Sequence, residues 1–372
     1  MFVAERDLLR GAGHEVVTYE VHNDDIGTGL VERLGVAVAT PWSRATMRAL
    51  CDLLGRERPD VAHFHNTFPL ISPSAYRACQ AARVPVVQTL HNYRLVCPGG
   101  LLQRGGRPCE ECVGHSLLPA VVHRCYRDSV AGTAVAAGML LFNRARSTYR
   151  DDVDRYIALT EFGREILVRG GLPAERIVVR PNGLTEDPGV GDGAGGFALF
   201  VGRLSAEKGV GTLINAWRCV PALPLVVVGS GELRGKLEAL ARAAEINVTF
   251  LGQRPRSEVL ALMRSATLLV MPSECYEGLP VSYVEALGCA LPVAASRLGA
   301  LGEILCDGEN GAHFPPANPD ALAATVNAMV ADTAALTRIR RNNRSLYEAR
   351  YSPAAALKSL EGIYRSVLPG AT

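Results

Sequence analysis

Short runs of β-branched residues alternate with helical patterns along almost the whole chain of 372 residues. Such alternation is typical of βαβ units, in which parallel strands form a sheet. The pattern stops at a Gly- and Asp-rich stretch, residues 189–196, which has no apolar periodicity, and then it starts again. The sequence therefore predicts an α/β fold of two Rossmann-like, doubly wound parallel-sheet domains joined by a linker.

The predicted elements divide evenly between the two halves. The strands are expected at 14–21, 60–65, 84–90, 155–160, 176–181, 197–204, 224–230, 247–252, 266–272 and 292–296. The helices between them are expected near 2–11, 43–56, 72–82, 130–148, 162–169, 209–219, 232–244, 256–264, 280–288 and 319–331. We predict an N-terminal domain over 1–188, a C-terminal domain over 189–352, and a segment over 353–372 whose helix packs back on the first domain.

The composition is that of an ordinary globular protein, with 48% hydrophobic residues and a net charge of +2, which argues against a nucleic-acid partner. No signal peptide is visible after Met1. The best apolar run, 130–142, is shorter than the roughly 20 residues that a membrane span needs. Ten cysteines without an export signal indicate a reducing compartment. We therefore predict a cytoplasmic protein.

Basic residues gather between Arg94 and Arg150, where eight arginines face three acids, a local net charge of +5. A patch of this kind favours peripheral contact with an anionic membrane, at the inner membrane face, or with an anionic acceptor. A solvated, Arg-rich surface is the alternative.

Ligands of open parallel sheets bind beyond the carboxyl ends of the strands, so the residues at those ends are candidates for a site. In FVGRLSAEKG a strand ends and a helix begins at Gly209, which places Arg203 and Lys208 near the N-terminus of that helix. Two cations beside free backbone N–H groups suit a diphosphate. Taken alone, this loop would be better explained by two solvated side chains.

The stretch ECYEGLPVSYVEALGC places two carboxylates around a Gly–Leu–Pro turn. Pro280 is expected as the first helical residue, which leaves the amides of Gly278 and Leu279 unpaired and able to hold phosphate or sugar oxygens. One carboxylate accepts hydrogen bonds from two adjacent sugar hydroxyls. Stabilisation by the helix dipole explains Glu277 near the helix start, but it does not explain Glu285, more than a turn inside.

Together these motifs resemble the family-4 glycosyltransferases of the GT-B fold, retaining enzymes whose two domains face a central cleft and which use nucleotide-sugar donors. The resemblance covers the second domain in order, through VGRLSAEKG, VVVGSGE, VTFLGQ and EGLPVSYVE, and the first domain through TLHNYRLVCP and RPNG. In one respect the chain departs from the family. The family's first strand and Gly-rich loop are not seen before Met1, which implies a shortened N-terminus and a doubtful activity.

The resemblance implies a reaction and a role for two cations. A hexose would pass from a nucleotide-diphosphate sugar to a hydroxyl of a glycan, a lipid-linked sugar or a small molecule, by front-face displacement with retention. Arg203 and Lys208 would bind the diphosphate and stabilise the charge on the departing nucleotide, which is the main catalytic contribution expected. No catalytic metal is then required.

The resemblance also implies roles around the sugar and the nucleoside. Glu277 would contact the donor sugar, with the amides of Gly278 and Leu279 beside it, and Glu285 would hold the ribose hydroxyls. The remaining implied site residues are Gly252 and Gln253 along the nucleobase, and His91 across the cleft near the sugar and the acceptor.

Four cysteines, Cys97, Cys109, Cys112 and Cys125, follow the His91 motif with a spacing that suits a structural zinc site. Four buried free thiols are the alternative. The segment from HNYRLVCP to HRCYR resembles a subgroup of the family that is linked to cell-surface polysaccharide assembly.

Two other functions stay open. Another nucleotide-sugar reaction of the same fold, such as epimerisation, would need further acids near the sugar, and none is identified. An inactive scaffold protein on a transferase fold would explain the shortened start. At the end of the strand 60–65 we expect His63 to be structural, whereas the role of His65 is open.

Overall fold

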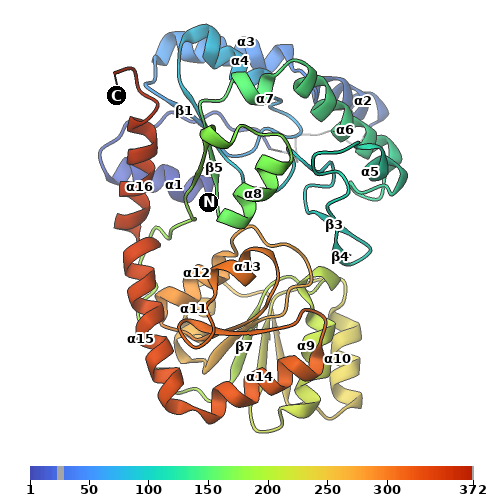
Figure 1. Cartoon of the computed structure of the whole chain (residues 1–372), viewed down its shortest axis with the longest axis vertical. Helices are drawn as coiled ribbons and strands as arrows, with labels where there is room; N and C mark the ends of the chain where they lie inside the picture. The colour runs from blue at the N-terminus through green and yellow to red at the C-terminus, as the bar shows by residue number, and fades with distance from the viewer. Residues whose placement is uncertain (23–28, 371–372) are drawn as a thin grey trace. The chain divides into compact units, whose positions relative to one another are not determined.

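The structure, a computed structural model, describes residues 1–22 and 29–370. It divides into two compact units (Figure 1). The first unit comprises Met1–Arg104, Cys109–Arg180 and Leu357–Thr372, and the second comprises Gly105–Pro108 and Pro181–Ala356. Each unit contains a parallel sheet with helices, so the predicted α/β class is confirmed. The chain passes from the first unit to the second between residues 180 and 181, and it returns to the first between residues 356 and 357. The sequence predicts these boundaries at 188/189 and 352/353.

The first unit is built on a four-stranded parallel sheet in the order β1-β2-β5-β6. Its strands are β1 Ala62–Phe64, β2 Val86–Thr89, β5 Arg155–Ala158 and β6 Ile177–Val179. Its helices are α1 Phe2–Gly11, α2 Leu30–Ala39, α3 Arg44–Glu57, α4 Ser74–Ala82, α5 Leu118–Val122, α6 Val130–Ala145, α7 Thr148–Asp151, α8 Glu161–Arg169 and the greater part of α16 Pro353–Arg365. Leu9, Val87, Ile157 and Leu360 are buried together, so α1 and α16 share one core with the sheet.

The predicted strand at 14–21 is wrong, because residues 14–22 form neither helix nor strand. A cavity of about 560 Å³ is lined by Val17 and Thr18 on one side and by Ala62 and Phe64 of β1 on the other. A strand exists through the hydrogen bonds of its ladder. The segment has the apolar pattern of a strand, but the cavity separates it from β1, so the two do not pair.

The second unit contains a six-stranded parallel sheet in the order β12-β11-β10-β7-β8-β9. Its strands are β7 Ala198–Val201, β8 Leu225–Val228, β9 Val248–Gly252, β10 Leu268–Met271, β11 Val293–Ser296 and β12 Gly311–Phe314. Its helices are α9 Val210–Ala216, α10 Arg234–Ala243, α11 Arg256–Ser265, α12 Val281–Gly288, α13 Gly299–Ile304, α14 Pro319–Ala331 and α15 Thr333–Arg350. Every residue of β10 and β11 is buried, as expected for strands covered on both faces.

The strand order fixes where this sheet can bind a ligand. The chain passes from β7 to β8 and β9 on one side, and then returns to β10 on the other side of β7. The loops that leave β7 and β10 therefore turn in opposite directions, which opens a crevice at their carboxyl ends.

A short hairpin, β3 Gln103–Arg104 and β4 Arg107–Pro108, lies within the cysteine-rich segment. Within the described residues, no helix combines the length and the apolar character that a bilayer span requires.

Candidate active site

The loops that follow β7 and β10 lie against each other at the carboxyl end of the second sheet. Gly209 stands at the start of α9 with a φ of +64°, and a Cβ there would lie 1.8 Å from the carbonyl oxygen of Pro272. Only glycine permits this approach. The amide of Glu274 donates to the carbonyl of Glu207 at 2.9 Å, which joins the two loops a second time.

This approach brings together two residues that the sequence predicted for different parts of the donor. Lys208 Nζ lies 2.6 Å from Glu277 Oε1, and Ser273 Oγ donates to the same oxygen at 2.7 Å. The side chains of Lys208 and Glu277 are 28% and 13% exposed. The pair is thus held in a fixed geometry while the ammonium remains accessible from solvent.

Arg203 extends from the same loop but is held loosely. Its side chain is 71% exposed, and its ion pair with Glu207 spans 3.9 Å. Glu207 in turn accepts a hydrogen bond from Ser205 Oγ at 2.6 Å. An exposed guanidinium on a long side chain can move to an anionic ligand without breaking a strong contact.

Glu285 has a partner that the sequence did not indicate. Arg256, the first residue of α11, donates from Nε to Glu285 Oε1 at 2.8 Å, and the Glu285 side chain is only 9% exposed. No motif marked Arg256. A cation beside a buried carboxylate on the next helix becomes visible only once α11 and α12 pack together.

The helix start after the Gly–Leu–Pro turn differs from the prediction by one residue. Pro280 is the N-cap with a ψ of 128°, and α12 begins at Val281. Within the described chain, the amides of Gly278 and Leu279 have no hydrogen-bond acceptor in the structure. These donors are thus available at the start of the helix, as predicted.

Gly252 and Gln253 lie at the end of β9. Gly252 has a φ of +73°, and its carbonyl accepts from the amide of Gly229 at 2.9 Å, which joins the end of β9 to the turn after β8. Gln253 is exposed.

His91 belongs to the first unit, where it follows β2. Its Nε2 lies 2.9 Å from Nδ1 of His65, which follows β1. Burial lowers the pKa of His91, and burial together with the neighbouring charge of His63 lowers the pKa of His65 to about 3. Both rings are therefore neutral at pH 7.

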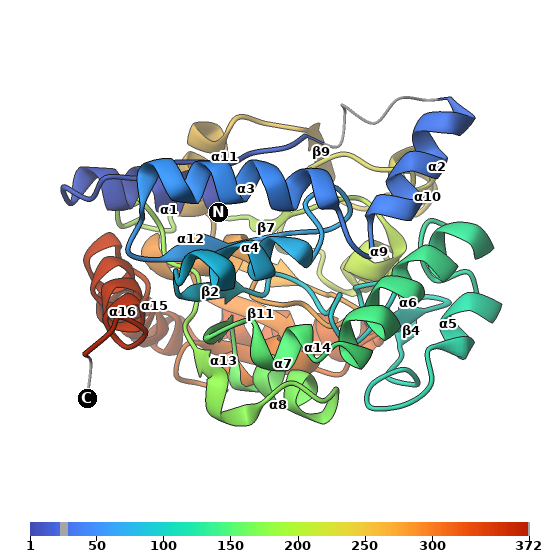
Figure 2. The same cartoon turned by 90° about the horizontal axis from the view of Figure 1, so that it is seen from above.

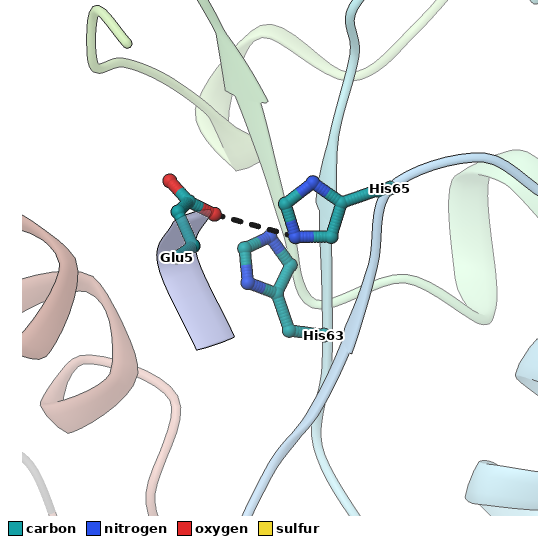
Figure 3. Close-up of side chains that lie close together, drawn as sticks. All are labelled: Glu5, His63 and His65. Carbon is teal, nitrogen blue, oxygen red and sulfur yellow. Dashed lines mark ion pairs between the residues drawn. The ribbon is translucent and has the colours of Figure 1, made fainter. Parts of the chain in front are cut away.

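Glu5 of α1 completes this group from the opposite side (Figure 3). One of its oxygens is paired with Arg180, which follows β6, and Oε2 lies 3.3 Å from His65 Nε2. His63 uses both ring nitrogens, with Tyr364 Oη and Thr89 Oγ1 each at 2.8 Å. The prediction that His63 is structural agrees with these contacts. Arg180 begins the RPNG motif but was given no role from the sequence, and no motif marked Glu5.

Glu5, His63 and His65 bring three potential ligand atoms within 4.8 Å of one another, the one such group among the described residues. The donor set would suit a transition metal. However, Arg180 already neutralises Glu5, and both nitrogens of His63 are engaged, so the charge and the hydrogen bonds disfavour a cation here.

The four cysteines of the Cys97–Cys125 segment lie in the first unit, close enough for the thiols to affect one another's pKa. Among the described residues, no three of them bring their sulfur atoms within 4.8 Å of one another. A Cβ at Gly99 would lie 3.3 Å from the Cβ of Cys125, and Cys109 N–H donates to Leu102 O at 2.8 Å. Burial is the main cause that raises the pKa of the Cys112 thiol to about 11, and the other three thiols of the cluster add to it.

Two family models match the chain: "Glycosyl transferase 4-like domain" over residues 6–183 and "Glycosyl transferases group 1" over residues 192–346. Glycogen synthase of Mycobacterium tuberculosis is 34% identical over 297 residues, which are 77% of this chain and 64% of that protein. The chain spans only 44% to 61% of the length of three other curated relatives.

Two solved structures share the fold. Sucrose-phosphate synthase from Thermosynechococcus elongatus has a TM-score of 0.71 and 19% identity, covering 98% of this chain and 92% of that one. Anabaena HepE, in complex with UDP and glucose, has a TM-score of 0.61 and 18% identity, covering 85% and 81%. The family matches and the GT-B fold together show that this chain belongs to the family-4 glycosyltransferases.

Proposed function

We propose that the chain is a retaining glycosyltransferase that moves a hexose from a nucleotide-diphosphate sugar to a hydroxyl of a glycan, a lipid-linked sugar or a small molecule. The observation that supports this most is the Lys208–Glu277 pair at the crevice between β7 and β10. It places a cation and a sugar-binding carboxylate where an open parallel sheet binds ligands. HepE, which shares the fold, was solved with UDP and glucose.

In this proposal each contact of the site has a task. Lys208 and Arg203 hold the diphosphate and stabilise the negative charge that develops on the leaving nucleotide. The amides of Gly278 and Leu279 add donors at the helix start. Glu277 accepts from the sugar hydroxyls with its position fixed by Ser273.

The nucleoside is held by the neighbouring loops. Glu285, fixed by Arg256, accepts from the ribose hydroxyls with the oxygen that Arg256 leaves open. Gly252 and Gln253 lie along the base at the end of β9. His91, which belongs to the first unit, is the remaining residue that we propose to act in catalysis.

The test is release of nucleoside diphosphate from a panel of nucleotide sugars, with and without added acceptors. We expect slow hydrolysis by the chain and a fall of roughly 10²- to 10³-fold in Lys208→Met and Glu277→Gln. Lys236→Met, on the exposed face of α10, is the matched control and should keep the full rate. Tight binding without turnover of any donor would support the inactive scaffold instead, and interconversion of donor sugars would support an epimerase.

The four cysteines fit a structural zinc site in their donor chemistry, because thiolates are the preferred ligands of zinc. Cys97, Cys109, Cys112 and Cys125 would hold the ion and order the Gly-rich segment between them. Zinc content of the purified protein tests this. We expect about one equivalent, lost in Cys112→Ser and kept in Cys219→Ser, an exposed cysteine of the second unit. A zinc-free protein of unchanged stability would refute the site.

Peripheral membrane contact is supported by an exposed apolar face of the first unit. On α2, Val31 and Val38 are 80% and 79% exposed, and on α5, Leu118 and Val122 are 65% and 64% exposed. Both helices contact α6 (Figure 2). The side chains of Leu141 and Phe142 on α6 are also exposed. Such a face beside the arginines of 94–150 suits an anionic lipid surface.

Sedimentation with vesicles of phosphatidylglycerol and phosphatidylcholine tests the membrane contact. Binding is expected to fall with salt and to be weakened in Val38→Asp. Val190→Asp, a substitution of an exposed valine in the second unit, is the control. A bound fraction that changes neither with salt nor in Val38→Asp would contradict the proposal.

A further inference from the structure

A chain of three polar side chains runs through the first unit, from α1 to the loop after β2. Glu5 Oε2 lies 3.3 Å from His65 Nε2, and His65 Nδ1 lies 2.9 Å from His91 Nε2. The two imidazole rings are stacked, with centroids 5.2 Å apart and an angle of 12° between their planes. Figure 3 shows the Glu5 end of this chain, with His65 turned toward the carboxylate.

The group is buried and its charges are arranged asymmetrically. The side chains of Glu5 and Arg180 are 6% and 1% exposed, and Arg180 occupies the other carboxylate oxygen. Glu5 Oε2 is itself buried and accepts no hydrogen bond of good geometry among the described residues. His65 Nε2, at 3.3 Å, is the ring nitrogen that faces it. Burial is the main cause that lowers the pKa of His91; Glu5 acts in the opposite direction, and Arg180 lowers the pKa further.

These contacts favour one placement of the hydrogens on the two rings. A neutral histidine has one N–H donor and one lone pair, and a carboxylate only accepts. With its hydrogen on Nε2, His65 presents a donor to the facing carboxylate of Glu5 and accepts with Nδ1. His91 must then donate from Nε2 to His65, which leaves the lone pair of His91 on Nδ1. The structure records no further hydrogen bond of His91 within the described residues.

We propose that Glu5 and His65 are positioning residues that fix the tautomer of His91, so that its Nδ1 accepts a hydrogen bond from a substrate hydroxyl. The role of His91 at the substrate rests on the proposed function, whereas the tautomer is a property of the free protein. Arg180 supports the arrangement because it holds the carboxylate of Glu5 in place. A hydroxyl presented to the wrong tautomer would meet an N–H instead of a lone pair.

A metal ion bound to Glu5, His63 and His65 is the competing use of the same atoms. It would occupy a nitrogen of His65 and remove the hydrogen from Nε2 or Nδ1. The two arrangements therefore predict different positions for the hydrogen on the His65 ring. One NMR spectrum distinguishes between them.

The experiment is a long-range 1H–15N correlation spectrum of the full chain labelled with 15N-histidine, at pH 7.5 with EDTA. We expect His65 and His91 both neutral with hydrogen on Nε2. His91 found with hydrogen on Nδ1, or found protonated, would overturn the proposal. A change of the His65 signals on addition of zinc without EDTA would instead assign the group to a metal.

Variants extend the test. In His65→Leu the acceptor is lost, and the His91 signals should shift to a mixture of tautomers, whereas His115→Gln at an exposed site should leave them unchanged. If the chain turns over a donor, His65→Leu should lower kcat about tenfold, as loss of one hydrogen bond does, with little change in the KM for the donor. An unshifted His91 spectrum in a folded His65→Leu protein would refute the positioning role, even if no donor is turned over.

Discussion

Lys208 and Glu277 each have a functional task in the proposal, but in the free protein they are partners of one another. The ammonium and the carboxylate are 2.6 Å apart and mostly shielded from solvent. A ligand phosphate would draw the ammonium toward itself, while Ser273 continues to hold the carboxylate. The ion pair is therefore a resting arrangement that keeps both groups in place before the donor arrives.

A double-mutant cycle measures this pair. We expect Lys208→Met and Glu277→Gln each to lower the free energy of unfolding, with a coupling energy of about 1 kcal/mol, as is typical for a partly exposed ion pair. Urea denaturation of the two single variants and the double variant gives the value. Strict additivity of the two substitutions would show that the pair does not form in solution.

His63 makes the stability of the first unit depend on pH. Its pKa is lowered from 6.5 to about 3, first by burial and then by Arg180 and His91. The unfolded chain takes up a proton near pH 6.5, whereas the folded protein does not do so until near pH 3. The unfolded state thus binds more protons across this window, and stability falls as the pH decreases through it.

We expect His63→Gln to reduce the pH dependence of the unfolding free energy by about 1 kcal/mol per pH unit between pH 6 and pH 5. The wild-type protein should lose stability more steeply than the variant over that range. His115→Gln, at an exposed position, should follow the wild-type curve. Equal slopes in all three proteins would mean that His63 is protonated in the folded state.

Residues at the ends of strands could be predicted from the sequence, because motif spacing marks them. Arg203, Lys208 and Glu277 were found in this way, and the structure brings Lys208 and Glu277 into contact. Arg256 and Glu5 could not be found, because each acts through a partner far away in sequence. Long-range pairs of this kind leave no local pattern.

At the scale of elements, the tight approach of α9 to the end of β10 depends on Gly209. Its positive φ and the carbonyl of Pro272 leave no space for a side chain. Gly209→Ala should therefore destabilise the protein by about 2 to 4 kcal/mol and separate Lys208 from Glu277.

Gly211→Ala is the matched control for that substitution. Gly211 lies two residues further along, as the second residue of α9, and a Cβ there has nothing within 4 Å. Alanine is the better helix former, so this change should leave stability unchanged or raise it by up to about 1 kcal/mol. Equal destabilisation by the two substitutions, measured by thermal unfolding, would argue against the close approach at Gly209.

The elements that the sequence predicted well are those with a strong apolar pattern, such as β10 and α14, the latter matching its predicted bounds. The helix α15, 18 residues long, was missed because its composition is polar and its arginines hide the apolar stripe. The segment 14–22 shows the opposite failure, since a strand pattern is present and no ladder forms. Periodicity reports which residues can be buried, but pairing depends on neighbours elsewhere in the chain.

At the scale of the whole molecule, the candidate functional residues divide between the two units. The proposed donor-binding residues belong to the second unit, on the loops after β7, β9 and β10 and, for Glu285, within α12. His91 and the residues proposed to position it belong to the first unit, at the ends of β1, β2 and β6 and, for Glu5, on α1. The fold could be predicted from the alternating pattern, whereas the base, the sugar and the acceptor depend on loop contacts that no motif specifies.

The central claim is that the crevice between β7 and β10 binds a nucleoside diphosphate. The most direct test is the shift in Tm of the full chain with UDP, GDP, ADP and TDP, because a ligand of the folded state stabilises it by mass action. We predict that one of the four raises the Tm of the wild-type protein and of Lys236→Met, and that the rise is largely lost in Lys208→Met. An equal rise in Lys208→Met, or no rise with any diphosphate, would contradict the account.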